Sequence, residues 1–172
     1  SWAYLFNQDQ PTNDFHALVH KLQHLGYQGV ELGAFAPHPN PESHDTKEKR
    51  QKLRKMVVDH RLDFSAMAPD LWSQKLWSVD DAGPFLAAFE KNLIFADDLG
   101  IQTIRVDTVE PITRVQEVGI EPKLIFDRCV AAFDKCAKLA ATRGINICWE
   151  FEPGFPISKP SEIVALIDAV RS

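Results

Sequence analysis

The sequence predicts part of a (β/α)₈ barrel, namely its first five β/α units. One observation is a unit that recurs along the chain, in which an amphipathic helix leads through a short turn into an apolar strand. A second is the placement of Gly26, Gly100 and Gly144 where helices have to end, because only glycine enters a left-handed cap without strain. Strands that alternate with long helices pair in parallel through right-handed crossovers.

Each element is predicted from its periodicity and its end signals. The first helix is capped by Asn13, and the fourth begins at Pro122, a favourable first-turn residue. The fifth helix begins at Pro160 and is still running at Ser172. The expected helices are Asp14–Leu25, Thr46–His60, Asp80–Asp98, Pro122–Arg143 and Pro160–Ser172. The expected strands are Trp2–Phe6, Gly29–Gly33, Leu62–Ala68, Thr103–Asp107 and Ile145–Phe151.

Alternation within the strands separates the barrel from its alternative, a five-stranded open sheet of the flavodoxin type. In the last expected strand, Ile147 and Trp149 share an apolar face, whereas Glu150 lies on the opposite, polar face. The strands Thr103–Asp107 and Gly29–Gly33 alternate in the same way. An open sheet is covered by helices on both faces, so its central strands should be apolar throughout. A barrel with a polar interior therefore fits the pattern better.

Length and charge limit the organisation and the partners. The 172 residues contain no internal linker, so we expect a single domain over residues 1–172, truncated before barrel strands six to eight. A net charge of −5 argues against a nucleic-acid partner, and no apolar run approaches the length of a membrane span. The sequence leaves open whether copies of the protein form a homo-oligomer.

The cysteines and the absence of several common motifs narrow the class of protein further. Three cysteines without a C-x-x-C pair fit a reduced, cytoplasmic protein, and we expect all three as small buried side chains. No export signal is visible, although the chain begins at Ser1 and not at a Met. The motifs of dinucleotide oxidoreductases, P-loop hydrolases, zincins and serine hydrolases are absent.

Polar and aromatic residues gather at the expected carboxyl ends of the strands, where the active sites of such barrels lie. The candidates are Tyr4, His38, Asp107, Glu150 and Glu152, accompanied at the same ends by Phe6, Asn7, Asp70, Trp72, Thr108 and Glu110. Aromatic faces can cover the C–H side of a sugar while carboxylates accept its hydroxyl protons. The set indicates a small, hydroxyl-rich substrate. Asp107 has an alternative role as the cap of the loop that follows it.

Two stretches resemble a known family. Gly26-Tyr-Gln-Gly-Val-Glu-Leu-Gly33 is similar to the second-strand entry of the xylose isomerase-like barrels. The run Phe126–Gly144, followed by Ile145-Asn-Ile-Cys-Trp-Glu150, resembles their approach to strand five. The resemblance covers nearly the whole chain. It implies a divalent-metal-dependent sugar isomerase or epimerase that moves a proton next to a carbonyl.

The resemblance also implies roles for individual residues. The family's strand-five glutamate binds a divalent metal, commonly Mn²⁺, Mg²⁺ or Co²⁺, and in the epimerases it also moves a substrate proton. Glu150 matches that position and would be both metal ligand and catalytic residue, with Glu152 as the fallback ligand. From their places at the expected strand ends, the substrate contacts are expected to be Tyr4, His38, Asp107 and Glu152. The family's other ligands, typically an Asp, a His and a Glu, come from strands six to eight, which this sequence does not contain.

Other functions stay open within the same superfamily. A metal-dependent dehydratase of a cyclic polyol or dehydroshikimate-like acid would use the same glutamate. A non-catalytic sugar-binding barrel would have lost its metal ligands. An apurinic-site endonuclease shares the fold, but Arg105-Val-Asp107 lacks the histidine of that class. Ketose 3-epimerases carry a second glutamate six residues after the metal ligand, where this chain has Pro156, which argues against that subgroup.

Two further groups of residues are expected to have structural roles. His16, His20 and His24 are spaced four apart but fall opposite the apolar face of their helix, so we expect them exposed on the outside of the barrel. Glu31 and Arg105 both point inward. They are expected to form an interior ion pair, because a buried charge needs a partner.

Overall fold

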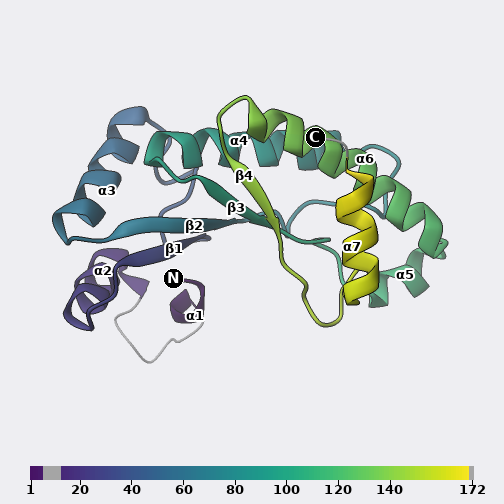
Figure 1. Ribbon diagram of the computed structural model, residues 1–172, viewed down its shortest axis with the longest axis horizontal. Helices are drawn as coiled ribbons and strands as arrows, with labels where there is room; N and C mark the ends of the chain where they lie inside the picture. Colours follow the sequence, from purple (N-terminus) through teal and green to yellow (C-terminus); the bar gives the residue numbers. More distant parts are fainter. Residues whose placement is uncertain (6–12, 171–172) are drawn as a thin grey trace. The chain divides into compact units, whose positions relative to one another are not determined.

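The computed structural model describes residues 1–5 and 13–170, which form two compact units. Unit 1 comprises Ser1–Asp70 and Lys91–Ile104, and unit 2 comprises Leu71–Glu90 and Arg105–Ser172. Two of the three boundaries fall within α4 (Gly83–Leu99) and β3 (Thr103–Val106), which are labelled in Figure 1, so both of these elements contribute to both units.

Unit 1 is built on the parallel strands β1 (Gly29–Ala34) and β2 (Asp63–Pro69), which lie side by side in Figure 1. The register shifts between Val30 and Glu31 of β1. β2 also pairs in parallel with the first part of β3, where Met67 lies opposite Ile104. Alternation places the apolar side chains Val30 and Leu32 of β1 in the core, as predicted. The buried residues of these strands are Val30, Leu32, Gly33, Ala34, Met67, Ala68 and Pro69.

The helices of unit 1 begin at residues whose side chains cap them. α2 (Phe15–His24) starts after Asp14, whose Oδ1 accepts hydrogen bonds from the backbone N–H groups of His16 at 2.9 Å and Ala17 at 3.3 Å. The predicted cap, Asn13, is therefore wrong by one residue. α3 (Lys47–Asp59) starts one residue after its predicted first residue, Thr46, because Thr46 is the cap and its Oγ1 accepts the N–H of Lys49 at 3.3 Å.

The predicted first strand is wrong. Residues Trp2–Leu5 form a short helix, α1, and Phe6 lies outside the described residues. Five consecutive apolar residues are too few to distinguish a strand from one helical turn. Ser1 nevertheless contacts β1, because its amino group donates to the carbonyl of Glu31 and its Oγ accepts the N–H of Gly33 at 2.9 Å.

In unit 2, β4 (Asn146–Trp149) lies beside β3, where the N–H of Glu150 donates to the carbonyl of Val106 at 2.9 Å. α6 (Pro122–Ala141) begins at its predicted proline and buries Ile125, Cys129, Phe133 and Cys136. The helical segment α5 (Thr113–Val118) was not predicted, since it is shorter than two turns. α7 (Pro160–Ala169) ends at Ala169 because Val170 is extended, so the expectation that it runs to Ser172 is wrong.

α4 begins three residues later than predicted. The Oδ1 of Asp81 accepts the N–H of Gly83 at 2.8 Å, so the turn around Asp81 precedes the first helical residue. Phe85 and Phe89, in the first part of this helix, are buried in unit 2. Leu93 and Phe95, further along it, are buried in unit 1.

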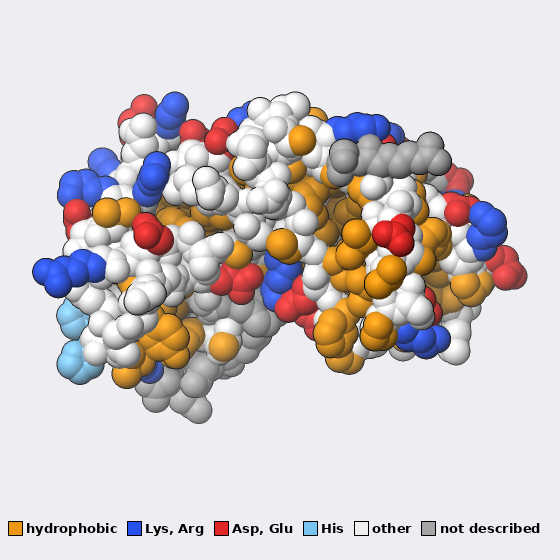
Figure 2. All heavy atoms as spheres, in the orientation of Figure 1, with side chains coloured by type: hydrophobic (Ala, Val, Ile, Leu, Met, Phe, Trp, Pro, Cys, Tyr) orange, Lys and Arg blue, Asp and Glu red, His pale blue; other side chains and the backbone are white. Residues whose placement is uncertain are grey.

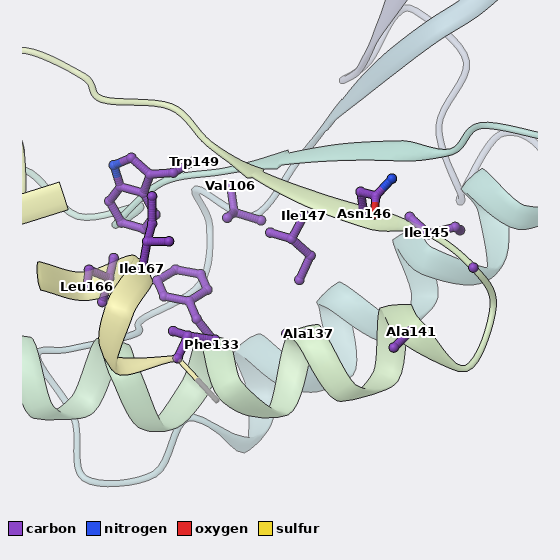
Figure 3. Close-up of a pocket in the computed structure, with 12 residues that line it drawn as sticks. Val106, Phe133, Ala137, Ala141, Ile145, Asn146, Ile147, Trp149, Leu166 and Ile167 are labelled. Carbon is purple, nitrogen blue, oxygen red and sulfur yellow. The ribbon is translucent and has the colours of Figure 1, made fainter. Parts of the chain in front are cut away.

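An apolar cavity of about 490 Å³ lies in unit 2 between β4, α6 and α7. Figure 3 shows Phe133 of α6 beside Trp149 of β4, and their rings meet edge to face at 5.3 Å. Ile145, Ile147 and Trp149 all line this cavity, which confirms the apolar face predicted for β4. Hydrophobic side chains also gather on the surface over α7 in Figure 2, where Val164 and Ile167 are exposed.

The cysteines divide into two classes. Cys129 and Cys136 are buried in α6, and burial raises the pKa of both thiols to about 12. Cys148 is exposed on β4, so the expectation that all three cysteines are buried is wrong for this one. In the part of the chain that the structure describes, no helix is both long and apolar enough to cross a membrane.

Candidate functional site

The loop after β3 is a tight turn held by Asp107. Its Oδ1 accepts the N–H of Val109 at 2.6 Å, and its Oδ2 accepts the indole N–H of Trp72 at 3.2 Å. Val109 has φ of 55°, and the N–H of Glu110 donates to the carbonyl of Thr108 at 2.6 Å. A β-branched residue at positive φ is strained and persists only where neighbouring contacts fix it. Asp107 therefore caps the loop, the alternative that the sequence had left open.

Glu110 fixes the neighbouring segment of unit 2. The carboxylate of this buried residue accepts, through Oε2, the backbone N–H groups of Leu76 at 2.8 Å, Trp77 at 3.1 Å and Ser78 at 3.2 Å. Sequence reasoning placed Glu110 at the strand end but gave it no role, because its partners are backbone groups more than thirty residues earlier. The contact ties the segment that carries Trp72 to the loop that carries Asp107.

Glu150 forms an ion pair with Arg105. Arg105 lies on β3 and Glu150 directly follows β4, the adjacent strand, and both side chains are partly buried. The pair of Arg105 with Glu31 of β1, expected from the sequence, stays a prediction.

Three carboxylates and one guanidinium influence one another at these strand ends. Burial is the main cause that raises the pKa of Asp107, and the Glu150 carboxylate raises it further, while Arg105 lowers it. The pKa of Glu152 is also raised, first by burial and then by Glu150 and Asp107. The structure thus brings together Asp107, Glu150 and Glu152, three of the five site residues predicted from the sequence.

An aromatic pair stands next to this cluster. The rings of Trp72 and Phe155 meet edge to face at 6.3 Å and 82°. Trp72 is 41% exposed, and its indole N–H is already held by Asp107. A partly exposed indole beside carboxylates combines an apolar surface with hydrogen-bond acceptors, the combination that a hydroxyl-rich ligand requires. Phe155 lies in the candidate stretch that follows the last expected strand, but no sequence pattern linked it to Trp72.

The other predicted site residues belong to unit 1. His38 is fully buried, its Nδ1 lies 3.1 Å from Ser1 Oγ, and its ring packs against Phe15. Tyr4 lies within α1 and not at the end of a strand, and the Nζ of Lys21 is 5.2 Å from its ring. Phe6 and Asn7, which the sequence placed at the same strand end, lie outside the described residues.

The side chains at this site are of the kind that binds a divalent cation, but there are too few of them to complete its coordination. Carboxylate oxygens are the ligands that hard cations prefer, and the Glu150 side chain is 34% exposed and therefore reachable. Within residues 1–5 and 13–170, however, no three His, Cys, Asp or Glu side chains converge, as they stand, on one point where a metal ion could bind. These residues can supply only part of a coordination shell.

Comparison with a family model identifies the fold. Residues 19–172 match the model described as xylose isomerase-like TIM barrel, and the chain belongs to this family. The match confirms the barrel predicted from the sequence and excludes the open sheet. No curated protein matches the chain.

Solved structures agree with the family assignment. A D-psicose 3-epimerase in the presence of D-fructose is 22% identical, with a TM-score of 0.65 over 91% of this chain and 54% of that one. A xylose isomerase-like TIM barrel protein from Mycobacterium smegmatis in complex with magnesium is 19% identical, with a TM-score of 0.68 over 94% and 54%. The probable 3-DHS dehydratase AsbF from Bacillus anthracis is 16% identical, with a TM-score of 0.67 over 97% and 56%. The chain therefore spans about half the length of these relatives, and the likeness concerns the fold.

Proposed function

We propose that the protein is a divalent-metal-dependent isomerase or epimerase of a small sugar or sugar-like substrate. The observation that carries the proposal is Glu150, a reachable carboxylate directly after β4, paired with Arg105 and accompanied by Asp107 and Glu152. Active sites of (β/α)₈ barrels lie at the carboxyl ends of their strands, where these residues are found. Solved structures of similar fold include an epimerase with a sugar and a barrel with magnesium.

In this proposal Glu150 holds the metal together with ligands from outside these 172 residues. A cation bound there would polarise a substrate carbonyl and acidify the neighbouring C–H. The Glu150 carboxylate would accept or return the proton, and the ion pair with Arg105 would hold that carboxylate in place until the cation binds. Glu152 would accept a hydrogen bond from a substrate hydroxyl, and the exposed face of Trp72 would cover an apolar side of the sugar.

A dehydratase of a cyclic polyol or dehydroshikimate-like acid is the second candidate. Pro156 favours it, because this residue stands where ketose 3-epimerases carry a second glutamate, and a proline side chain offers no acceptor for substrate hydroxyls. Both reactions use a carboxylate that moves a proton next to a carbonyl, so Glu150 would serve either one. Assays of the complete protein with D-fructose and with 3-dehydroshikimate separate them, and rapid C3 epimerisation of D-fructose would contradict the reading of Pro156.

Two matched substitutions in the complete protein test the role of Glu150. Glu150→Gln keeps the size of the side chain but removes the charge that binds a cation. We expect it to lower metal content and to reduce turnover by roughly a hundredfold or more, because the same carboxylate serves both steps. Glu152→Gln is the control on the same segment and should mainly raise KM. If Glu152→Gln loses metal and turnover while Glu150→Gln keeps both, the ligand is Glu152. If neither changes, the metal-enzyme proposal fails.

A further inference from the structure

Three histidines meet on the surface of unit 1. His16 and His20 are exposed on α2, one helical turn apart, and His60 directly follows α3. The ring centroids of His16 and His60 are 5.1 Å apart with an interplanar angle of 88°, and those of His20 and His60 are 6.2 Å apart at 81°. Figure 2 shows histidine side chains open to solvent over α2. The sequence singled out the helical stripe but not His60, which comes from a different helix.

A hydrogen bond at Nδ1 fixes the ring of His60. Its Nδ1 lies 2.8 Å from the backbone carbonyl of Met56. A carbonyl only accepts, so the neutral ring donates its Nδ1–H there and keeps the lone pair on Nε2. Metal-binding histidines characteristically donate their second ring nitrogen to a carbonyl or carboxylate in this way, which fixes both the tautomer and the ring orientation.

The ring separations are close to those of imidazoles that share one ion. Two imidazoles bound to a tetrahedral zinc at Zn–N distances of about 2.0–2.1 Å have ring centroids roughly 5 Å apart. The His16–His60 separation is already of this size, and the His20–His60 separation is slightly larger. A pair four residues apart on one helix presents both side chains on the same face.

We propose that His16, His20 and His60 form a surface site for a divalent transition-metal ion of the zinc class. As the rings stand, edge to face, no three metal-ligating side chains of the described residues converge on one point, so the two exposed rings of α2 have to turn toward His60. Rotation of exposed side chains takes place in picoseconds to nanoseconds and needs no change in the backbone. Imidazole nitrogen favours Zn²⁺, Ni²⁺ and Cu²⁺ over Mg²⁺, which separates this site in kind from the carboxylates around Glu150.

Zinc titration calorimetry on the complete protein tests the proposal, with zinc chloride as the probe. The titrations are made in the Glu150→Gln variant, in which the proposed metal site at Glu150 is weakened. Zinc binding in this variant therefore reports on the histidine site, and a failure of the Glu150 proposal does not change the result. We expect one saturable zinc site, and His60→Ala or His20→Gln should each weaken it by roughly tenfold or more. His24→Gln is the matched control, since His24 is also exposed on α2 but makes no ring contact with His60 in the described structure, and it should leave zinc affinity unchanged.

Two further readouts keep the test decisive. His60→Ala removes the contact to Met56 and could disturb the end of α3, so His20→Gln, on an exposed helix face, carries the test if the first variant melts early. Zinc should also shift the ring ¹⁵N resonances of His16, His20 and His60 but not those of His24. Absence of saturable binding, or equal loss of affinity in His24→Gln and His20→Gln, would overturn the proposal.

Discussion

Removal of the Glu110 carboxylate is expected to destabilise the protein strongly, although this residue is not one of the proposed ligands. Glu110 is 6% exposed, and one of its oxygens accepts three backbone N–H groups, those of Leu76, Trp77 and Ser78. Leu76 and Trp77 are themselves 1% and 0% exposed, so water cannot replace the lost acceptor without a rearrangement of the segment. Glu110→Ala therefore leaves buried donors unsatisfied.

The magnitude follows from the cost of unsatisfied donors. Hydrogen bonds to charged groups contribute about 1.5–3 kcal/mol each, but three donors that share one oxygen are not additive. For Glu110→Ala we expect a loss of about 3–5 kcal/mol in the free energy of unfolding, comparable to breaking a buried charged contact. Glu110→Gln keeps an oxygen acceptor without the charge and should lose about 1–2 kcal/mol.

Urea denaturation of the complete protein measures both losses from the shift in the transition midpoint. Glu117→Ala is a suitable control, because Glu117 lies on α5 with its side chain 58% exposed in a pair with Arg114. Its loss should stay within about 1 kcal/mol. If Glu110→Ala costs no more than this control, the three hydrogen bonds do not fix the segment and the argument is wrong.

Two further predictions concern titration and thiol reactivity. Burial raises the pKa of Asp107 above its ordinary value of 3.8, so its favourable contribution to folding is present below that value and is lost as pH rises through the higher folded pKa. The stability of wild type relative to Asp107→Asn should therefore fall across this window in urea titrations at stepped pH, and a constant difference would refute the assignment. Under native conditions a disulfide reagent should modify Cys148, which is exposed, but not the buried Cys129 or Cys136, and rapid reaction of either buried thiol would contradict the fold of α6.

Much of the barrel could be predicted from the sequence because its signals are local. Helix ends are marked by residues such as Thr46 and Pro122, and the faces of β4 by the alternation around Ile147. The failures occurred where local signals are weak or competing. Trp2–Leu5 is too short for its period to be read, and Asn13 and Asp14 are both good caps, so their order could not decide which one serves.

Three residues of the candidate site were predicted from the sequence, but the contacts that they make were not. Alternation and strand ends select Asp107, Glu150 and Glu152 from the sequence. The ion pair of Glu150 with Arg105 and the contact of Asp107 with Trp72 depend on which segments become neighbours, which the sequence pattern does not specify. Glu110 illustrates the same limit, since backbone N–H groups carry no sequence signal.

The central claim is that Glu150 is a metal ligand at the carboxyl ends of the strands. The most direct test is to soak crystals of the complete protein in MnCl₂, determine the structure and locate the ion by its anomalous scattering. We predict an ion within about 2.5 Å of a Glu150 carboxylate oxygen, with Arg105 displaced from that oxygen. A fully occupied manganese site elsewhere, with the Arg105–Glu150 ion pair intact, would contradict the account.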